Sequence, residues 1–132
     1  MVYTWGMSSL FTKIINREIP AHIIYEDEKT IAFLDINPVQ PGHTLVVPKT
    51  EVDHLDELNA EDYQATMATV KHLMGRLKTR MDTERVGLQV EGFDVPHAHV
   101  KLIPCNTAEE FRANPAQADQ ESLKLFAEQL SS

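Results

Sequence analysis

The sequence predicts an α+β domain in which an antiparallel sheet of about five strands is combined with one long helix, one short helix and a C-terminal helix. Short runs rich in apolar and β-branched residues alternate with turn residues, which is typical of strands. A longer run that begins near Asn59 has apolar residues at helical spacing. Because only one long helix interrupts the strands, their order favours an antiparallel sheet over alternating β-α units.

The N-terminal region is expected to contain a flexible extension and then the short helix. Residues 1–8 fit no pattern and are assigned to the extension, whereas a single domain is assigned to residues 9–132. Ser8 or Ser9 can cap the short helix by accepting a backbone hydrogen bond, and the helix ends before Pro20. One side of this helix carries Phe11, Ile14 and Ile15.

Five strands follow from the positions of apolar runs and of the residues that break them. The first two are joined by a polar turn, the third follows a rigid Pro-containing loop, and a turn through Gly92 precedes the fifth. The expected strands are residues 23–26, 30–35, 43–47, 86–90 and 95–104.

The two remaining helices are predicted from apolar residues at spacings of three and four. Residues 122–130 form the C-terminal helix, with Leu123, Phe126 and Leu130 directed inward. The polar segment 106–120 has little periodicity and supports no prediction of its contacts. The long helix has an apolar stripe made of Tyr63, Met67, Val70, Met74, Leu77 and Met81.

Composition limits the function. A chain of 132 residues with 42% apolar residues is about one domain with a real core. Its formal net charge of −8 argues against a nucleic-acid polymer or an anionic membrane as the main partner. One cysteine, Cys105, excludes an intrachain disulfide. We find no apolar run of membrane-spanning length and no signal peptide, so a cytoplasmic location is expected.

One motif carries the strongest chemical signal: two histidines and a lysine at alternate positions of an apolar run. In an extended chain His97, His99 and Lys101 project to one face, spaced by roughly 6–7 Å, whereas the residues between them face the core. That spacing suits a phosphate group and favours phosphoryl chemistry. By itself, however, a His-x-His pair on a strand is more often structural than catalytic.

Four segments that include this motif occur in one order with characteristic spacing. They are residues 11–15 with 18–20, 32–38, 42–49 and 97–101. Together they resemble the histidine triad (HIT) family, in the branch that hydrolyses nucleoside phosphoramidates, and the resemblance extends over residues 10–104. It implies a HIT-like fold, an enzyme that needs no cofactor, and a homodimer paired through the long helix and an adjoining strand.

The resemblance also implies roles for the motif residues. His99 is the expected nucleophile, attacking the α-phosphate of a nucleotide to form a nucleotidyl-histidine intermediate, which water hydrolyses. A backbone carbonyl is expected to hold its second ring nitrogen. His97 is expected to orient the strand, and His43 to donate to phosphate oxygens. His22, His54 and His72 belong to no motif and are expected to be solvated.

The nucleoside is expected to lie in a separate apolar slot, which favours purines by stacking and burial. By the resemblance Asp35 accepts hydrogen bonds from the ribose hydroxyls, although it could also simply cap the turn toward Pro38. The expected slot is formed by Leu10, Phe11, Ile14, Ile19, Phe33 and Ile36.

Three departures from the family pattern alter these expectations. Lysine replaces the third histidine at position 101, so catalysis is expected to persist with a changed rate or leaving-group preference. Residues 89–94 are short and lack the asparagine and serine of related hydrolases, and Asp94 lies near the serine's place. Ser9, Thr12 and Glu51 stand where many relatives bind zinc, so no metal is expected.

Three functional classes therefore remain open. The first is a hydrolase of purine nucleoside phosphoramidates or related phosphoanhydrides. The second is a nucleotide-binding protein with little or no turnover, and the third is a metal site built on His97 and His99. Sequence alone does not identify the physiological substrate or choose between adenine and guanine.

Overall fold

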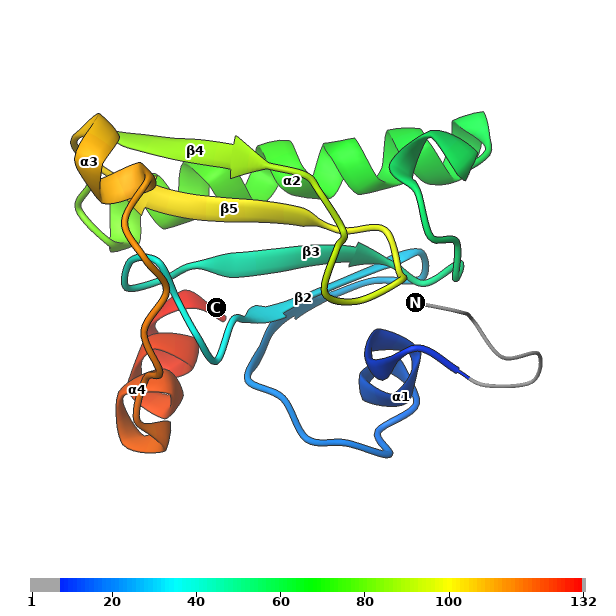
Figure 1. The fold of residues 1–132 in the computed structure, drawn as a ribbon, viewed down its shortest axis with the longest axis horizontal. Helices are drawn as coiled ribbons and strands as arrows, with labels where there is room; N and C mark the ends of the chain where they lie inside the picture. The colour runs from blue at the N-terminus through cyan, green and yellow to red at the C-terminus, as the bar shows by residue number, and fades with distance from the viewer. Residues whose placement is uncertain (1–7, 132) are drawn as a thin grey trace.

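The computed structural model describes residues 8–131 and contains one five-stranded sheet, in the order β1-β2-β3-β5-β4 (Figure 1). Every neighbouring pair is antiparallel, which confirms the predicted α+β class. Residues 1–7, most of the expected extension, lie outside the described residues. The elements are α1 (Leu10–Ile15), β1 (Ile23–Glu26), β2 (Thr30–Leu34), β3 (Thr44–Pro48), the 3-10 turn η1 (Leu55–Glu57), α2 (Ala60–Arg80), β4 (Arg85–Gln89), β5 (Val100–Cys105), α3 (Ala108–Phe111) and α4 (Gln120–Leu130).

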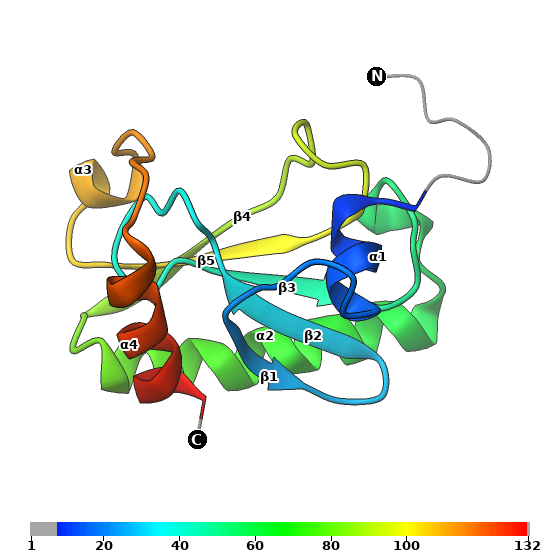
Figure 2. The same cartoon turned by 90° about the horizontal axis from the view of Figure 1, so that it is seen from below.

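The alternation of side chains along each strand divides the core into two layers. On one face of the sheet, α2 and α4 cover a cluster that includes Ala32, Leu34, Val46, Val100 and Leu102. On the other face, α1 packs through Phe11 and Ile14 on a second cluster that includes Ile31, Phe33, Leu45 and Val47. Figure 2 shows α1 and α2 on opposite sides of the sheet.

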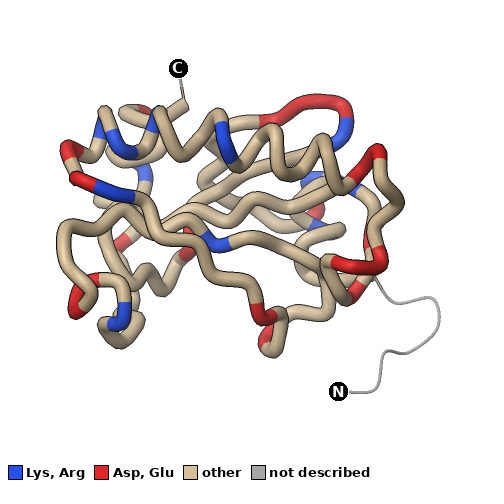
Figure 3. The backbone as a smooth tube through the Cα atoms, turned by 90° about the horizontal axis from the view of Figure 1, so that it is seen from above, with Lys and Arg blue, Asp and Glu red and all other residues tan. Residues whose placement is uncertain are grey.

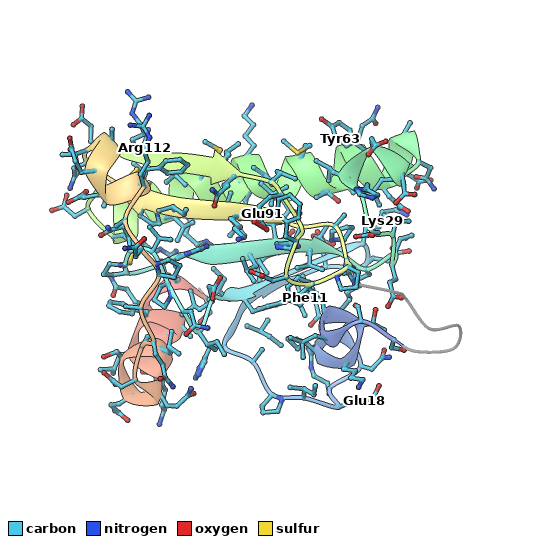
Figure 4. All side chains as sticks on the ribbon, in the orientation of Figure 1. Phe11, Glu18, Lys29, Tyr63, Glu91 and Arg112 are labelled. Carbon is cyan, nitrogen blue, oxygen red and sulfur yellow. The ribbon has the colours of Figure 1, made fainter. Side chains whose placement is uncertain are left out.

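The long helix begins after Asn59, as predicted, because the Asn59 side chain accepts a hydrogen bond from the backbone N–H of Asp62. Its predicted apolar stripe is only partly correct. Val70 and Leu77 are buried, but Tyr63 is 44% exposed and lies on the side of α2 away from the sheet (Figure 4). The buried face of α2 is rotated relative to the predicted stripe, since it includes Thr66, Thr69 and Leu73 and leaves Tyr63 out. Thr69 is accommodated there by a 2.8 Å hydrogen bond to Thr30 on β2.

The fifth strand is shorter than predicted, because β5 starts at Val100 instead of residue 95. Before it, the chain turns: the His97 N–H donates to the Val95 carbonyl, and the Ala98 N–H donates to the Val52 carbonyl. Residues 95–99 are therefore fastened to the segment that follows β3. The side chains still alternate, since Val100 and Leu102 enter the α2 layer and Lys101 does not.

The polar segment after β5 holds the loop that follows β2. Backbone N–H groups of Ala116 and Ala118 donate to the carbonyls of Pro38 and Ile36. The C-terminal helix was predicted, and it starts two residues earlier, at Gln120. The short helix α3 was not predicted; its Phe111 ring lies against Gly87 of β4, where a larger side chain would collide with it.

Charged residues are spread over the molecule. Figure 3 shows the lysine and arginine positions separated along the chain, with acidic positions between them. Among residues 8–131, no helix is both long and apolar enough to cross a membrane.

Candidate active site

A cavity of about 650 Å³ opens on the α1 face of the sheet. Its floor is a row of paired strand residues, because Phe33 pairs with Leu45 and Leu45 pairs with Lys101. His99 and Asp35 also line it, and Phe11 lies between α1 and the sheet (Figure 4). All seven residues predicted to hold the nucleoside line the cavity: Leu10, Phe11, Ile14, Ile19, Phe33, Asp35 and Ile36.

The orientation of the His99 ring is fixed by a backbone carbonyl two residues earlier in the chain. Its Nδ1–H donates to the His97 carbonyl over 2.7 Å, which fixes the tautomer and leaves Nε2 as the lone-pair nitrogen. The ring is 4% exposed and stands edge-on to Phe11, with the ring centroids 5.0 Å apart. Burial lowers the pKa of His99, although the bond to the His97 carbonyl opposes this. The imidazole is therefore neutral near pH 7, the form that can attack phosphorus.

The His97 ring lies on the same α1 side as His99, with its centroid 5.8 Å from that of Phe11, but it does not line the cavity. Its Nε2–H donates to the Pro48 carbonyl over 2.8 Å, and its Nδ1 lies 2.7 Å from the Ser9 hydroxyl. The reason is the turn before Val100, which seats the ring against the N-terminus of α1. With both nitrogens in hydrogen bonds, His97 has an orienting geometry.

His43 lies beside Asp35 but, unlike Asp35, does not line the cavity. The Val39 N–H donates to Nδ1 of His43 over 3.0 Å, so Nε2 carries the proton. That Nε2–H is 3.7 Å from an Asp35 oxygen, and it is the one fully buried side-chain polar atom of the described residues with no hydrogen-bond partner. Burial lowers the pKa of His43 to about 4. A buried donor without an acceptor is costly, and a ligand oxygen would satisfy it.

Asp35 has one oxygen committed locally, because its Oδ1 accepts the Asn37 N–H over 2.8 Å. The turn-capping role left open by the sequence is therefore present. Its Oδ2 is the oxygen nearer His43, and the side chain lines the cavity. Capping therefore uses Oδ1, whereas Oδ2 lies toward His43.

Lys101 places an ammonium group on the cavity floor, 3.4 Å from a carboxylate oxygen of Glu91. Burial raises the pKa of Glu91, but the charge of Lys101 and the hydrogen bonds from Lys101 and from the backbone of Phe93 and Gly92 together outweigh this, and the net shift is downward. Glu91 is therefore ionised and offsets part of the lysine charge. Asp94 also lines the cavity, so the short loop before the motif adds a second carboxyl group near it.

Sequence reasoning missed the far rim of the cavity. His22, expected to be solvated, lines it and is 2.8 Å from the side-chain oxygen of Gln120 on α4. Leu45 and Val95 were also missed. Leu45 could have been found, since it alternates with His43 on the third strand. Gln120 could not, because only the tertiary fold brings α4 to this rim.

The residues at the family's zinc positions meet beside His97. A carboxylate oxygen of Glu51 accepts hydrogen bonds from the Ser9 N–H and from the Thr12 hydroxyl. The described residues contain no group of three or more His, Cys, Asp or Glu side chains arranged to hold a metal ion. The metal-ligating set is thus replaced here by hydroxyl groups and one carboxylate.

Comparison with known proteins agrees with this geometry, since the HIT domain family matches residues 16–112. The chain belongs to the HIT family. It is 41% identical over 100 residues to an uncharacterized HIT-like protein of Methanocaldococcus jannaschii, covering 72% of this chain and 77% of that one. It is 34% identical over 105 residues to the purine nucleoside phosphoramidase of Escherichia coli, covering 72% and 85%.

A solved structure agrees over nearly the whole chain. It is that of a Hit-like protein involved in cell-cycle regulation from Bartonella henselae, with a TM-score of 0.84, 27% identity and 98% of each chain covered. The similarity therefore extends past the family match to the C-terminal segment that borders the cavity.

Proposed function

We propose that this HIT protein is a hydrolase that cleaves purine nucleoside phosphoramidates or related phosphoanhydrides at the α-phosphate. One observation carries the proposal: His99 is neutral, held through Nδ1, and lines a cavity together with Asp35 and Lys101. The similarity to the E. coli purine nucleoside phosphoramidase supports the choice of substrate class. The proposed domain runs from residue 9 to 132.

The reaction follows from this arrangement in two displacements. Nε2 of His99 forms a bond to the α-phosphorus as the bond to the leaving nitrogen breaks, and the amine departs after taking up a proton. The imidazolium that forms is stabilised at Nδ1–H by the His97 carbonyl. Water then bonds to phosphorus while the histidine bond breaks. The proton that water gives up balances the one taken by the amine.

The charges around His99 suit the phosphoryl group. Lys101 supplies a positive charge on the cavity floor. Next to the cavity-lining Asp35, the buried Nε2–H of His43 has no hydrogen-bond partner and is the donor proposed for a phosphate oxygen. Such preorganised donors are worth several kcal/mol when they face developing negative charge. The Glu91 carboxylate beside Lys101 weakens this charge and favours a slower or more selective enzyme than one with a third histidine.

The nucleoside half of the substrate is assigned to the apolar part of the cavity. The proposed walls for a purine base are Phe11, Ile14, Phe33 and Ile36, which line the cavity. Oδ2 of Asp35, the oxygen that does not cap the turn, is proposed to accept from a ribose hydroxyl. Since the walls are mostly apolar, they bind by burial more than by reading base edges, which accommodates both adenine and guanine.

The direct test is a panel of adenosine and guanosine phosphoramidates, with rapid acid quenching and mass spectrometry of the peptide that contains His99. We expect nucleoside monophosphate release and a nucleotidyl adduct on His99 that is absent from His99→Ala. If AMP binds but no member of the panel is cleaved, the protein is a nucleotide-binding HIT protein without turnover. Stoichiometric zinc whose removal unfolds the protein would favour the metal-site alternative.

Two further proposals concern assembly and location. The exposed side chains Tyr63 on α2 and Leu88 on β4, an edge strand of the described sheet, favour a homodimer. Light scattering at micromolar concentration tests this, and a monomer mass contradicts it. The cytoplasmic location stays a prediction.

A further inference from the structure

Behind His99, outside the cavity, four side chains form a hydrogen-bonded cluster: Ser9, Thr12, Glu51 and His97. Ser9 is 4% exposed and His97 is fully buried, whereas Thr12 and Glu51 are half-buried, so the side of the cluster at His97 is shielded from water. Hydrogen bonds in such surroundings are strong and their loss is costly. None of the roles given to cavity residues explains why a carboxylate stands here.

The direction of each proton in the cluster can be assigned. Since Pro48 offers a carbonyl, Nε2 of His97 must carry the proton, and Nδ1 must accept from the Ser9 hydroxyl. Thr12 also lies within 3.5 Å of Nδ1, but its hydroxyl donates to Glu51 instead. Glu51 also accepts the Ser9 N–H over 2.9 Å. The carboxylate therefore decides which hydroxyl serves His97.

The cluster reaches His99 along the backbone. The carbonyl that orients His99 belongs to His97, whose ring the cluster holds at both nitrogens. The residue after Glu51 contributes as well, since the Val52 carbonyl accepts from the Ala98 N–H over 2.7 Å. A shift of this turn would move the His97 carbonyl and tilt the His99 ring.

Glu51 is also connected to Phe11, one of the proposed walls for the purine base. By accepting the Ser9 N–H and the Thr12 hydroxyl it holds the first turn of α1, which carries Phe11. Phe11 meets the His99 ring edge-on. The same carboxylate thus restrains the two elements between which the nucleophile sits.

We propose that Glu51 is a positioning residue for the proposed reaction: by holding Ser9 and Thr12 it fixes the hydroxyl that donates to Nδ1 of His97, and thereby holds the ring and the carbonyl that directs His99. The inference rests on the proposed function. A carboxylate suits the task because ionised acceptors form stronger hydrogen bonds than neutral ones. It does not touch the substrate, and its effect is on the alignment of the attacking nitrogen.

The test compares Glu51→Ala and Glu51→Gln with Glu18→Gln, an exposed glutamate beyond the end of α1 (Figure 4). Glu51→Ala is expected to lower kcat roughly 10- to 100-fold, the range for losing a few tenths of an ångström to 1 Å of alignment. KM is expected to change much less, because the cavity walls remain. Glu51→Gln keeps an acceptor oxygen and is expected to restore most of kcat, whereas Glu18→Gln is expected to match the parent.

A second readout does not depend on turnover. Nitrogen-15 NMR of the imidazole rings reports tautomers directly, and we expect Nε2–H for His97 and Nδ1–H for His99 in the parent protein. In Glu51→Ala the Nδ1 signal of His97 is expected to shift, because the Ser9 hydroxyl that donates to it is no longer held, whereas the Pro48 carbonyl still keeps the proton on Nε2. An unchanged His97 Nδ1 signal and an unchanged kcat in a folded Glu51→Ala protein would overturn the inference. A parent with these tautomers but no turnover would instead refute the proposed hydrolase.

Discussion

The two faces of the sheet are built from the same strands but differ in what they enclose. The α2 face is closed: Val46, Val100, Leu102, Leu73 and Leu77 are each at most 1% exposed. The α1 face is covered in part by Phe11 and Ile14 and in part opens into the cavity, which these two side chains also line. One side of the sheet therefore provides stability, and the other divides its residues between packing and chemistry.

The difference shows how four consecutive residues can serve both purposes. Along residues 99–102 the side chains alternate, so His99 and Lys101 line the cavity while Val100 and Leu102 pack under α2. A rigid core directly behind a reactive side chain limits its motion, which is what a positioned nucleophile needs. Substitutions on the two faces should therefore separate into effects on activity and effects on stability.

The largest expected effect is on the open face. His99→Ala removes the proposed nucleophile and should lower kcat by at least about 1,000-fold, because no other group can form the covalent intermediate. Steady-state kinetics with an adenosine phosphoramidate measures it. His54→Ala, at an exposed histidine before η1, is the control and should retain parent activity. Residual turnover within tenfold of the parent would contradict the assignment of His99.

On the closed face, Leu102→Ala should destabilise the fold by about 2–5 kcal/mol, because Leu102 is fully buried and its loss leaves a cavity. Urea unfolding measures the change. Well below the unfolding temperature, kcat should stay within a few-fold of the parent, although Leu102 is adjacent to Lys101 in the chain. Leu125→Ala, at a side chain that is 55% exposed on α4, should cost much less. A loss of activity without a loss of stability would show that the faces are not separable.

A third expected effect is that buried histidines near the cavity make the stability of the whole fold depend on pH. Burial holds the pKa of His43 at about 4, below its ordinary value of 6.5, so between these values the unfolded chain binds a proton that the folded protein does not. Stability should therefore fall as pH falls through this window, by up to about 1.4 kcal/mol per pH unit for one group. Buried His97 and His99, whose pKa values are also lowered, add to the slope.

The variant for this prediction is His43→Asn, whose side-chain oxygen can take the place of Nδ1 as the acceptor for the Val39 N–H. Its stability should depend less steeply on pH between 4 and 6.5 than that of the parent, measured by urea unfolding across that range. Equal slopes in the two proteins would mean that His43 is not held neutral by the fold.

The sequence predicts the strands of the sheet and the segment that carries His99 better than it predicts the far rim of the cavity. Alternation and turn residues predict five strands, and the motif resemblance places the seven nucleoside-slot residues that line the cavity. The stripe on α2 was placed too far toward Tyr63, because periodicity alone does not show which edge of a broad apolar face meets the sheet. The fifth strand starts later than predicted because a turn, held by Val52, replaces its first residues. Contacts such as His22 with Gln120 join distant segments and leave no local signal.

The smallest expected effect concerns the residue that departs from the family pattern. Lys101→His should change kcat by no more than about tenfold, because His99 keeps its tautomer through the His97 carbonyl, which does not involve position 101. The larger change should appear in the ratio of rates between amine and phosphate leaving groups, since the substitution removes a charge paired with Glu91. Competition between an adenosine phosphoramidate and ADP measures that ratio. If the parent is as inert as His99→Ala while Lys101→His is active, lysine at this position has abolished catalysis, and the open face is a binding site.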